Sequence, residues 1–520
     1  MELKNCTLGI EFGSTRIKGV LVDENHQVLA TGGYTWASKL KDGVWTYEMD
    51  EVHRGLQACF ADIKAAFESD YHQPLTEVGA IGISGMMHGF LPFDKDMKLL
   101  TPFRTWQNTI TQDAAETLSA AFQFNVPQRW SIAHLYQDVL NGAPYVKDIA
   151  YFTTLAGYIH WMLTGEKVLG VGEASGMFPI DSDCCDYSAP LLTKFDEMCK
   201  EKDIDLSAKA LLPKVLCAGE SAGVLTPSGA KLLDITGTLH AGIPFAPPEG
   251  DAGTGMVATN SVRTYTGNVS AGTSIFLMVV MDHLPKMHTE IDMVTTPSGK
   301  PVAMVHCNNC TADINGWVGL FQDFADSIGG KMDLGHLYDL LFKKALEADS
   351  DCGGLVSYNY LSGEVITGLN AGMPLFIRKP DSRFTLANFM KTQLFASLAT
   401  LKLGLDILNE EEVRLDMLYG HGGLFKTPGV GQRYMAAACN SPVTCMETAG
   451  EGGPYGMALL AVYLLNKDKA DSLEDYLDNL VFSGAKTVTL EPDPAEIESF
   501  MTYMKNYKKL LPVEKTAVDC

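Results

Sequence analysis

Basic residues are scarce in this sequence. It holds 40 Lys and Arg against 63 Asp and Glu, which leaves a formal net charge of −23 over 520 residues. The acidic residues are spread along the chain rather than gathered in a tail, so the charge favours solubility and repels polyanions. Nucleic acids and anionic membrane surfaces are therefore poor candidate partners. An anionic ligand would need a local positive field of its own.

Long apolar runs are also missing. No stretch of about 18 uninterrupted apolar residues occurs, and residues 1–6 show no basic region, apolar core or cleavage site of a secretory signal. The 12 cysteines are scattered without a short-loop spacing pattern, which favours free thiols over a disulfide framework. We expect a soluble, cytoplasmic protein.

Apolar material is plentiful, at 46% of the residues, and the length exceeds the ~250–300 residues at which one core stops growing. At least two domains are expected. The first ninety residues alternate short β-like runs with helical stretches, which is typical of a mixed α/β domain. Strands are expected over 8–12, 17–22 and 28–34, and a further strand over 78–83 follows a helix that Asp50 caps.

A similar order recurs in the second half. Its expected elements are strands over 262–268, 274–281, 302–307 and 415–419, and helices that begin after Thr311 and extend over 384–408. Two copies of one unit predict two domains that face a shared cleft. We place the boundary near Asn260, with domains at 1–259 and 260–520.

Each half opens with a turn of glycine, serine and threonine. A glycine in a tight turn lets main-chain N–H groups approach phosphate oxygens, and the hydroxyls add donors. Many hairpins carry such turns without a ligand, but a nucleotide clamped between two similar domains requires one turn from each. The two turns are Gly13-Ser14-Thr15 and Gly272-Thr273-Ser274.

Asp251 lies in a glycine-rich loop just before the expected boundary. A carboxylate at the edge of a cleft can accept the proton of an alcohol as that alcohol attacks a phosphoryl group. The alternative is an Asx-turn in a glycine loop. The position between the two halves favours the general base.

The run Gly420-His421-Gly422-Gly423 ends an expected strand, and Thr427 with Pro428 suits the N-cap and first position of a following helix. A glycine turn of this kind lets a flat base or a phosphate approach the main chain. A purely structural turn is the rival interpretation.

Two further segments carry directional polar groups beside apolar ones. His88 follows Met87, and Gln107 and Asn108 follow Trp106. Together these side chains could hold a polyol, because the amides and imidazole form hydrogen bonds while Trp106 covers C–H surfaces. Each segment alone is equally consistent with ordinary packing.

Cys307 and Cys310 have a Cys-x-x-Cys spacing next to a histidine. No second Cys/His pair stands at a finger or ribbon spacing, so we favour a loop with partly buried thiols over a zinc site.

Taken in order, these segments resemble the FGGY family of carbohydrate kinases, most closely its xylulokinase-like members. The resemblance covers nearly the whole chain and rests on the shared order of its motifs. Those motifs are Glu11 to Lys18, Met87-His88-Gly89, Trp106-Gln107-Asn108, Leu163 to Glu166, Glu173 to Gly176, Gly250-Asp251, Ser270 to Ser274, Gly422 to Lys426, and Glu447 to Ala458.

The resemblance implies an α/β fold with two actin-like, ribonuclease-H-like domains, each a duplicated βββαβαβα core, around a central cleft. It implies an ATP-dependent kinase that transfers the γ-phosphoryl group of MgATP to a hydroxyl of a ketose, with a xylulose-like ketopentose as the expected substrate. The N-terminal domain would bind the sugar and the C-terminal domain the nucleotide.

The same resemblance implies roles for individual residues. Asp251 would be the catalytic base, and Glu11, which stands where the family has Asp, would act with it on Mg²⁺ through water. Met87, His88, Trp106, Gln107, Asn108 and Asp251 would bind the sugar. The nucleotide would contact Gly13, Ser14, Thr15, Arg16, Lys18, Gly272, Thr273, Ser274, Gly422, Gly423 and Lys426.

Other functions stay open at this point. Glu11 and the lack of a carboxylate beside Gln107 allow a non-catalytic module that binds sugar and nucleotide. They also allow an FGGY kinase for another sugar, a polyol or a sugar acid. A homodimer is a possible assembly.

Overall fold

The computed structural model describes residues 2–446 and 452–520. The chain forms two compact units, and neither is continuous in sequence. The first comprises Met1–Arg263, Asp292–Val302 and Glu451–Gly484, and the second comprises Thr264–Ile291, Ala303–Gly450 and Ala485–Cys520. Within the described residues, no helix combines the length and apolar character needed to cross a bilayer.

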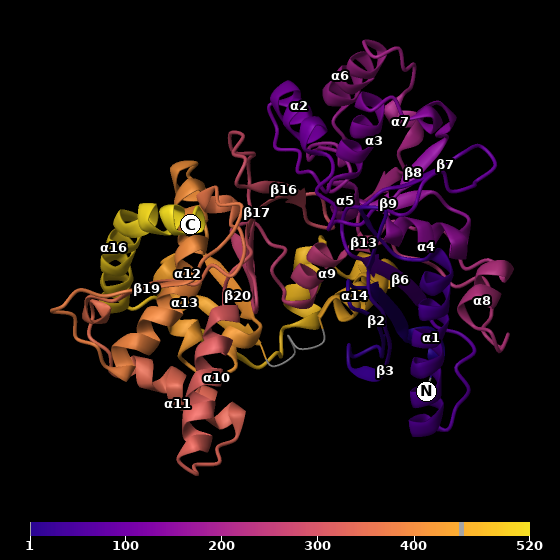
Figure 1. The fold of residues 1–520 in the computed structure, drawn as a ribbon. Coiled ribbons are helices and arrows are strands. Elements are labelled where there is room, and N and C mark those ends of the chain that lie inside the picture. Colours follow the sequence, from indigo (N-terminus) through magenta and orange to yellow (C-terminus); the bar gives the residue numbers. More distant parts are fainter. Residues whose placement is uncertain (1, 447–451) are drawn as a thin grey trace. The chain divides into compact units, whose positions relative to one another are not determined.

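A five-stranded sheet in the order β13-β6-β1-β2-β3 is the centre of the first unit (Figure 1). Strand β1 runs antiparallel to β2 and parallel to β6, and β6 runs parallel to β13. The strands are β1 (Thr7–Phe12), β2 (Arg16–Val22), β3 (Val28–Thr35), β6 (Ala80–Gly85) and β13 (Glu249–Gly250).

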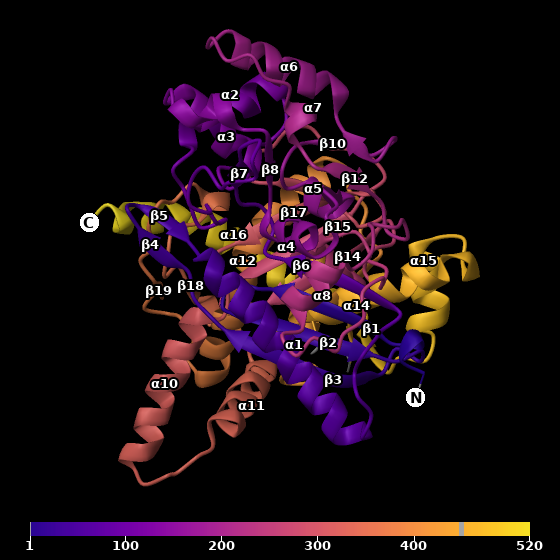
Figure 2. The same cartoon turned by 90° about the vertical axis from the view of Figure 1, so that its right-hand side faces the viewer.

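Helices cover both faces of this sheet. Gly9 and Gly19 stand on adjacent strands at neighbouring register positions, so they point to opposite faces. A Cβ at Gly19 would meet Ile63 of α1 (Met49–Tyr71), and a Cβ at Gly9 would overlap the main chain of α14 (Gly452–Asn466). The sheet is therefore sandwiched between α1, which Figure 2 shows laid along β2 and β3, and α14.

The remainder of the first unit is a helical layer with short strands. Its helices are α2 (Gln112–Phe122), α3 (Ser131–Leu140), α4 (Leu155–Thr164), α5 (Val171–Ala174), α6 (Ala189–Lys200), α7 (Ala208–Leu211), α8 (Pro227–Leu233), α9 (Asp251–Ala258) and α15 (Leu473–Tyr476). Its short strands are β4 (Lys39–Lys41), β5 (Val44–Thr46), β7 (Leu91–Phe93), β8 (Tyr151–Thr153), β9 (Val168–Gly170), β10 (Ile180–Asp181), β11 (Asp186–Tyr187), β12 (Lys214–Leu216) and β16 (Asp292–Thr295).

The sheet of the second unit repeats the topology of the first. Its strands run in the order β16-β17-β15-β14-β20-β21-β22, in which β17-β15-β14-β20-β21 repeats the first sheet and β16 and β22 are added at the two ends. As in the first unit, the central strand β14 is antiparallel to one neighbour, β15, and parallel to the other, β20. The strands of this sheet that follow in the chain are β14 (Thr266–Ala271), β15 (Ile275–Val280), β17 (Pro301–Cys307), β20 (Met417–His421), β21 (Val443–Met446) and β22 (Thr487–Leu490). Strands β18 (Val356–Tyr358) and β19 (Leu375–Ile377) pair in a separate two-stranded sheet.

This repetition confirms the predicted duplication. The helices of the second unit are α10 (Ala312–Ser327), α11 (Leu334–Lys344), α12 (Leu386–Glu410), α13 (Gly431–Cys439) and α16 (Pro494–Val518). The most buried of them is α12, which the sequence predicts over 384–408 and which begins after the capping hydroxyl of Thr385.

Two predicted helix starts and one predicted side-chain cap are wrong. Helix α1 has Glu48 at its N-cap, and Asp50 lies inside the first turn, where its charge still complements the helix dipole. Thr311 precedes α10 but makes no side-chain cap, because its hydroxyl donates to the Gly272 carbonyl instead. Thr427 and Pro428 do not start a helix, since α13 begins at Gly431.

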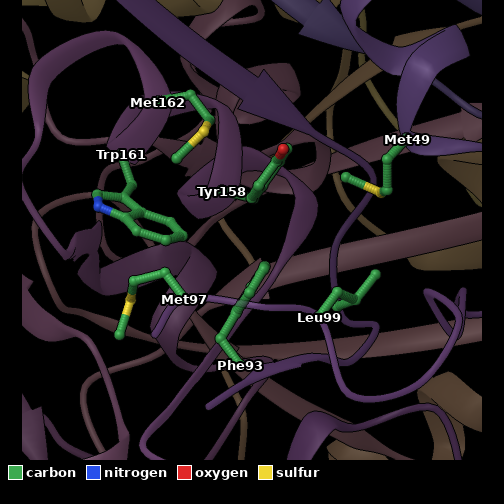
Figure 3. Close-up of a pocket in the computed structure, with 7 residues that line it drawn as sticks. All are labelled: Met49, Phe93, Met97, Leu99, Tyr158, Trp161 and Met162. Atoms are coloured by element: carbon green, nitrogen blue, oxygen red, sulfur yellow. The ribbon is translucent and has the colours of Figure 1, made fainter. Parts of the chain in front are cut away.

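A cavity of about 330 Å³ lies in the first unit among α1, α4 and the region of β7 (Figure 3). Its lining is apolar and sulfur-rich, and it contains none of the predicted site residues. The residues that line it are Met49, Phe93, Met97, Leu99, Tyr158, Trp161 and Met162.

Candidate active site

Two predicted carboxylates come together at the ends of β1 and β13, the two strands that flank β6 in the first unit. Glu11 is near the end of β1, and Asp251 begins α9 directly after β13. Burial raises the pKa of Asp251 to about 6, although main-chain N–H groups partly offset this. Burial and the nearby charge of Asp251 raise the pKa of Glu11 to about 8, while Lys18 opposes the shift. The two side chains therefore share one electrostatic environment.

Helix α14 packs directly against the side chain of Glu11. A Cβ at Gly453 would overlap Oε2 of Glu11 and would lie 3.1 Å from the hydroxyl of Thr254. Only glycine leaves room for the carboxylate at this point of the helix. The position of Glu11 thus depends on a segment more than 400 residues away in sequence.

The chemistry of this pair fits a hard cation. Carboxylate oxygens are the ligands that Mg²⁺ prefers, and Mg²⁺ commonly takes one or two of them with water and phosphate oxygens completing the shell. Within the part of the chain that the structure describes, no group of three or more His, Cys, Asp or Glu side chains could hold a metal ion. Any Mg²⁺ here would therefore depend on water and phosphate for most of its ligands.

Sequence reasoning missed two further buried carboxyl groups beside Asp251. Glu249 accepts the N–H groups of Gly172 and Glu173 at 3.3 and 2.9 Å, so it ties β13 to α5. Glu173 is completely buried, and neither of its carboxyl oxygens has a hydrogen-bond partner among the described residues. Burial raises the pKa of Glu249 to about 8 and that of Glu173 well above its usual range.

The sequence does place Glu249 and Glu173 next to recognisable motifs, but it does not indicate that their carboxyl groups are buried. Glu249 directly precedes Gly250-Asp251, and Glu173 stands in a motif of the family. Glutamate is almost never fully buried without a partner, so a sequence pattern alone assigns both residues to the surface.

Met87 lies beside Asp251, and His88 follows it in the chain. The Met87 N–H donates to Oδ1 of Asp251 at 3.3 Å. His88 has a positive φ of 69°, which turns its ring back onto Gly176, where Nδ1 lies 3.0 Å from the carbonyl oxygen. The ring is stacked on Trp130 with a centroid distance of 6.3 Å. These contacts join one predicted sugar-binding segment to the predicted base.

The residues from Trp106 to Asn108 differ in what their side chains contact. The Trp106 indole N–H donates to the Ser14 hydroxyl at 3.0 Å, which connects this segment to the first glycine turn. The side-chain amide of Asn108 accepts the Trp45 N–H at 2.8 Å and donates to the Trp45 carbonyl at 2.8 Å. Gln107 leaves its buried Oε1 without a partner among the described residues. The geometry leaves Gln107 more available to a ligand than Asn108.

The carbonyl groups of the first glycine turn accept hydrogen bonds from two aromatic residues elsewhere in the first unit. Trp36 donates its indole N–H to the Gly13 carbonyl at 2.7 Å and its main-chain N–H to the Thr15 carbonyl at 3.2 Å. The Tyr47 hydroxyl donates to the Ser14 carbonyl at 2.5 Å. With all three carbonyls held by these aromatic residues, the N–H side of the turn can face an anion. Arg16 and Lys18 follow on β2 with exposed side chains.

The turn of the second unit has the same arrangement. The Gly272 carbonyl accepts the Thr311 N–H at 3.0 Å and its hydroxyl at 2.7 Å, and the Thr273 carbonyl accepts the Cys310 N–H at 2.9 Å. The residues after β17 thus hold the carbonyls inward, just as Trp36 and Tyr47 do in the first unit. Ser274 closes the turn by accepting the Gly272 N–H at 2.9 Å.

Gly422 lies beside this second turn. It has a φ of 105°, and a Cβ there would lie only 2.5 Å from the Ala271 carbonyl oxygen, so a side chain is excluded by both conformation and space. Gly423 starts a 3₁₀ turn, and Lys426 ends it with an exposed side chain. Strand pairing of β14 with β20 therefore gathers the second turn and the glycine loop at one edge of the sheet.

The two thiols of the Cys-x-x-Cys spacing lie at the end of β17. Both are buried, and burial raises the pKa of Cys310 to about 12 and that of Cys307 well above its usual range. Zinc binds thiolates, so this environment favours the protonated thiols of a packed loop.

Comparison with known proteins decides the family. A model of the N-terminal domain of the FGGY family of carbohydrate kinases matches residues 6–258, and a model of the C-terminal domain matches residues 267–465. The chain belongs to the FGGY family of carbohydrate kinases. It is thus an enzyme of the phosphotransferase class that acts on an alcohol group.

Among relatives of this FGGY kinase is the xylulose kinase of Haemophilus influenzae, which is 22% identical over 475 residues, covering 88% of this chain and 90% of that protein. A xyloylose kinase from Brucella ovis has a similar structure, with a TM-score of 0.78, 19% identity, and coverage of 98% of this chain and 100% of that one. A gluconate kinase from Lactobacillus acidophilus gives a TM-score of 0.77 at 18% identity, with 99% and 98% covered. These likenesses confirm the two-domain actin-like fold.

Proposed function

We propose that this FGGY kinase transfers the γ-phosphoryl group of MgATP to a hydroxyl of a ketose sugar, with a xylulose-like ketopentose as the preferred acceptor. The observation that carries the proposal is the hydrogen bond from the Met87 N–H to Asp251, whose charge also acts on the carboxyl group of Glu11. A base, a sugar-binding segment and a second carboxylate thus meet in one unit. The xylulose kinase relative supports the choice of sugar.

Asp251 is the general base in this proposal. Its position at the start of α9 fixes the side chain, and the Met87 N–H orients Oδ1. The attacking sugar hydroxyl gives its proton to this carboxylate as the bond to phosphorus forms. Met87, His88, Trp106 and Gln107 hold the sugar, and Asn108 positions the neighbouring residues through Trp45.

The glycine turns bind the nucleotide. Gly13 and Gly272 close the two turns with their own N–H groups, so Ser14 and Thr15 of the first unit, and Thr273 and Ser274 of the second, offer N–H and hydroxyl groups to phosphate oxygens. Arg16, Lys18 and Lys426 add positive charge, and Gly422 with Gly423 leaves space for the adenosine. Phosphoryl transfer depends mostly on such positioning and charge stabilisation.

Glu11 and Asp251 would hold Mg²⁺ through water. When bound, the ion neutralises charge on the transferred phosphoryl group. Glu11 reaches one carbon further than the aspartate that the family has there, and the space that Gly453 leaves suits that longer side chain.

At the level of domains, we propose that residues 1–259 bind the sugar and 260–520 the nucleotide, in a cytoplasmic enzyme. The possible homodimer stays a prediction.

A coupled assay of ADP release over ketopentoses, ketohexoses, polyols and sugar acids tests the activity. We expect turnover with a ketopentose, and no turnover on the whole panel by native protein would contradict the proposal. Asp251→Ala should lower kcat by about 100- to 10,000-fold while calorimetry shows nearly unchanged ATP binding. Asp148→Ala, at an exposed aspartate of the same unit, is the matched control and should keep full activity.

A further inference from the structure

The hydrogen bonding of His88 fixes which of its ring nitrogens carries the proton. The ring is buried next to Arg129, and both facts hold its pKa down at about 3, so the imidazole is neutral. Nδ1 lies 3.0 Å from the Gly176 carbonyl oxygen, which can only accept. Nδ1 therefore carries the hydrogen, and Nε2 is an acceptor. A ligand at Nε2 must offer a donor such as a hydroxyl.

Gln107 adds a second acceptor. Its Oε1 is buried without a partner among the described residues, and an amide oxygen cannot donate. Asp251 contributes a carboxylate, whose Oδ1 accepts the N–H of Met87, the residue before His88. These groups suit a polyhydroxy compound, whose hydroxyls donate, and they repel a carboxylate, which has only acceptors at neutral pH.

One nearby cation could reverse this preference. Arg129 acts electrostatically on His88, and its carbonyl accepts the N–H of Gly89 at 3.4 Å. Its guanidinium is, however, occupied by an ion pair with Asp292, the first residue of β16. Asn125 donates to the other Asp292 oxygen at 3.1 Å and holds the carboxylate in place. The side chains of Arg129 and Asp292 are 24% and 13% exposed, so water screens the pair only partly.

We propose that Asp292 is a specificity-determining residue, which neutralises Arg129 and thereby excludes sugar acids from the acceptor site. This inference rests on the proposed function, since it concerns the same pocket. A planar guanidinium matches the two oxygens of a carboxylate. Without Asp292, the Arg129 guanidinium would be able to bind the carboxylate of an aldonate whose hydroxyl end faces Asp251. The fold alone does not make this choice, because kinases named for xylulose and for gluconate share it.

The variant Asp292→Asn tests the proposal, because it keeps the shape and a hydrogen-bond acceptor but removes the charge. Binding of D-xylulose and D-xylonate is measured by calorimetry on the full-length protein, and turnover of both by ADP release. We expect the wild type to favour xylulose, and the variant to shift the xylonate-to-xylulose binding ratio at least about tenfold toward xylonate, as one charge-assisted hydrogen bond would.

Two controls separate this effect from a general change in charge. Asp186→Asn removes the same charge from a pair with Lys209 in which both side chains are about half exposed, and it should leave the ratio unchanged. Adding Arg129→Gln to Asp292→Asn should abolish the gain for xylonate. Asp292→Ser provides a second charge-free variant if the asparagine variant does not fold.

An unchanged ratio in both charge-free variants would overturn the proposal, and so would a wild type that already favours xylonate. A gain for xylonate that survives Arg129→Gln would also overturn it. If neither compound were phosphorylated, the choice of a xylulose-like acceptor in the proposed function would fail, but the binding ratios would still decide the role of Asp292.

Discussion

At the scale of single residues, buried acids dominate the candidate site. Glu11, Glu173, Glu249 and Asp251 lie close to one another in the first unit, and burial raises the pKa of each carboxyl group. Their pKa values are nevertheless spread apart, with Asp251 at about 6 and Glu11 and Glu249 at about 8. Asp251 is therefore the group that is ionised first as the pH rises, which suits a base.

The pKa of Asp251 predicts how activity depends on pH. A base works only when ionised, so kcat/KM should fall about tenfold per pH unit below about pH 6 and level off above it. Steady-state kinetics at sugar concentrations well below KM between pH 5 and 8 would measure this, with circular dichroism at each pH to verify that the protein stays folded. A flat profile down to pH 5 would remove Asp251 from the role of base.

At the scale of elements, α14 couples the site to the distant end of the chain. Its second residue, Gly453, leaves room for the Glu11 carboxylate, and its middle packs on β1 and β6. Alanine normally favours a helix over glycine by about 0.5–1 kcal/mol. At Gly453 the overlap with Glu11 should reverse that sign.

We predict that Gly453→Ala lowers stability by about 1–3 kcal/mol, as overpacking does, and reduces kcat/KM by more than about tenfold, because Glu11 is displaced. Denaturant unfolding and steady-state kinetics would measure both. Gly319→Ala is the matched control, since that exposed glycine of α10 has no atom near its added Cβ; it should keep activity and raise stability by about 0.5–1 kcal/mol. Wild-type activity in Gly453→Ala would show that the position of Glu11 does not matter.

The sequence predicts the elements better than their ends. Strands such as 8–12 are recognisable because apolar residues continue through them and glycine turns bound them, and β1 occupies Thr7–Phe12. The sequence predicts the start of α10 directly after Thr311, but the side-chain cap does not form, because the Thr311 hydroxyl donates to the Gly272 carbonyl instead. The family order located Asp251, but the burial of Glu173 and Glu249 depends on β13 meeting α5, and no local pattern records that contact.

At the scale of the whole molecule, the two sheets share one topology. The two units are nevertheless not two consecutive halves of the sequence, because neither unit is continuous in the chain. The first unit takes α14 from beyond the second, and residues of α14 such as Met457, Leu459 and Leu460 are buried in it. Each buried side chain of this size stabilises by about 1.5–3 kcal/mol. Three of them approach the total stability of an ordinary domain, which is about 5–15 kcal/mol.

A fragment of residues 1–259 should therefore not fold alone. We expect it to lack a cooperative thermal transition and to bind a hydrophobic dye, because the face of β1 and β6 that α14 covers would be exposed. Co-expression of 1–259 with 260–520 as separate chains should restore the transition, since the second piece supplies α14. A cooperative transition in the isolated fragment would contradict this view of α14.

The position of α14 late in the sequence also delays completion of the first unit during protein synthesis. About 190 residues separate Arg263 from Gly452, and a ribosome adds about 5–20 residues per second, so the N-terminal sheet waits roughly 10–40 s for its last helix. Throughout that time the nascent chain presents an uncovered apolar face. This kinase should therefore depend on chaperones during translation more than a protein whose domains are each finished before the next begins.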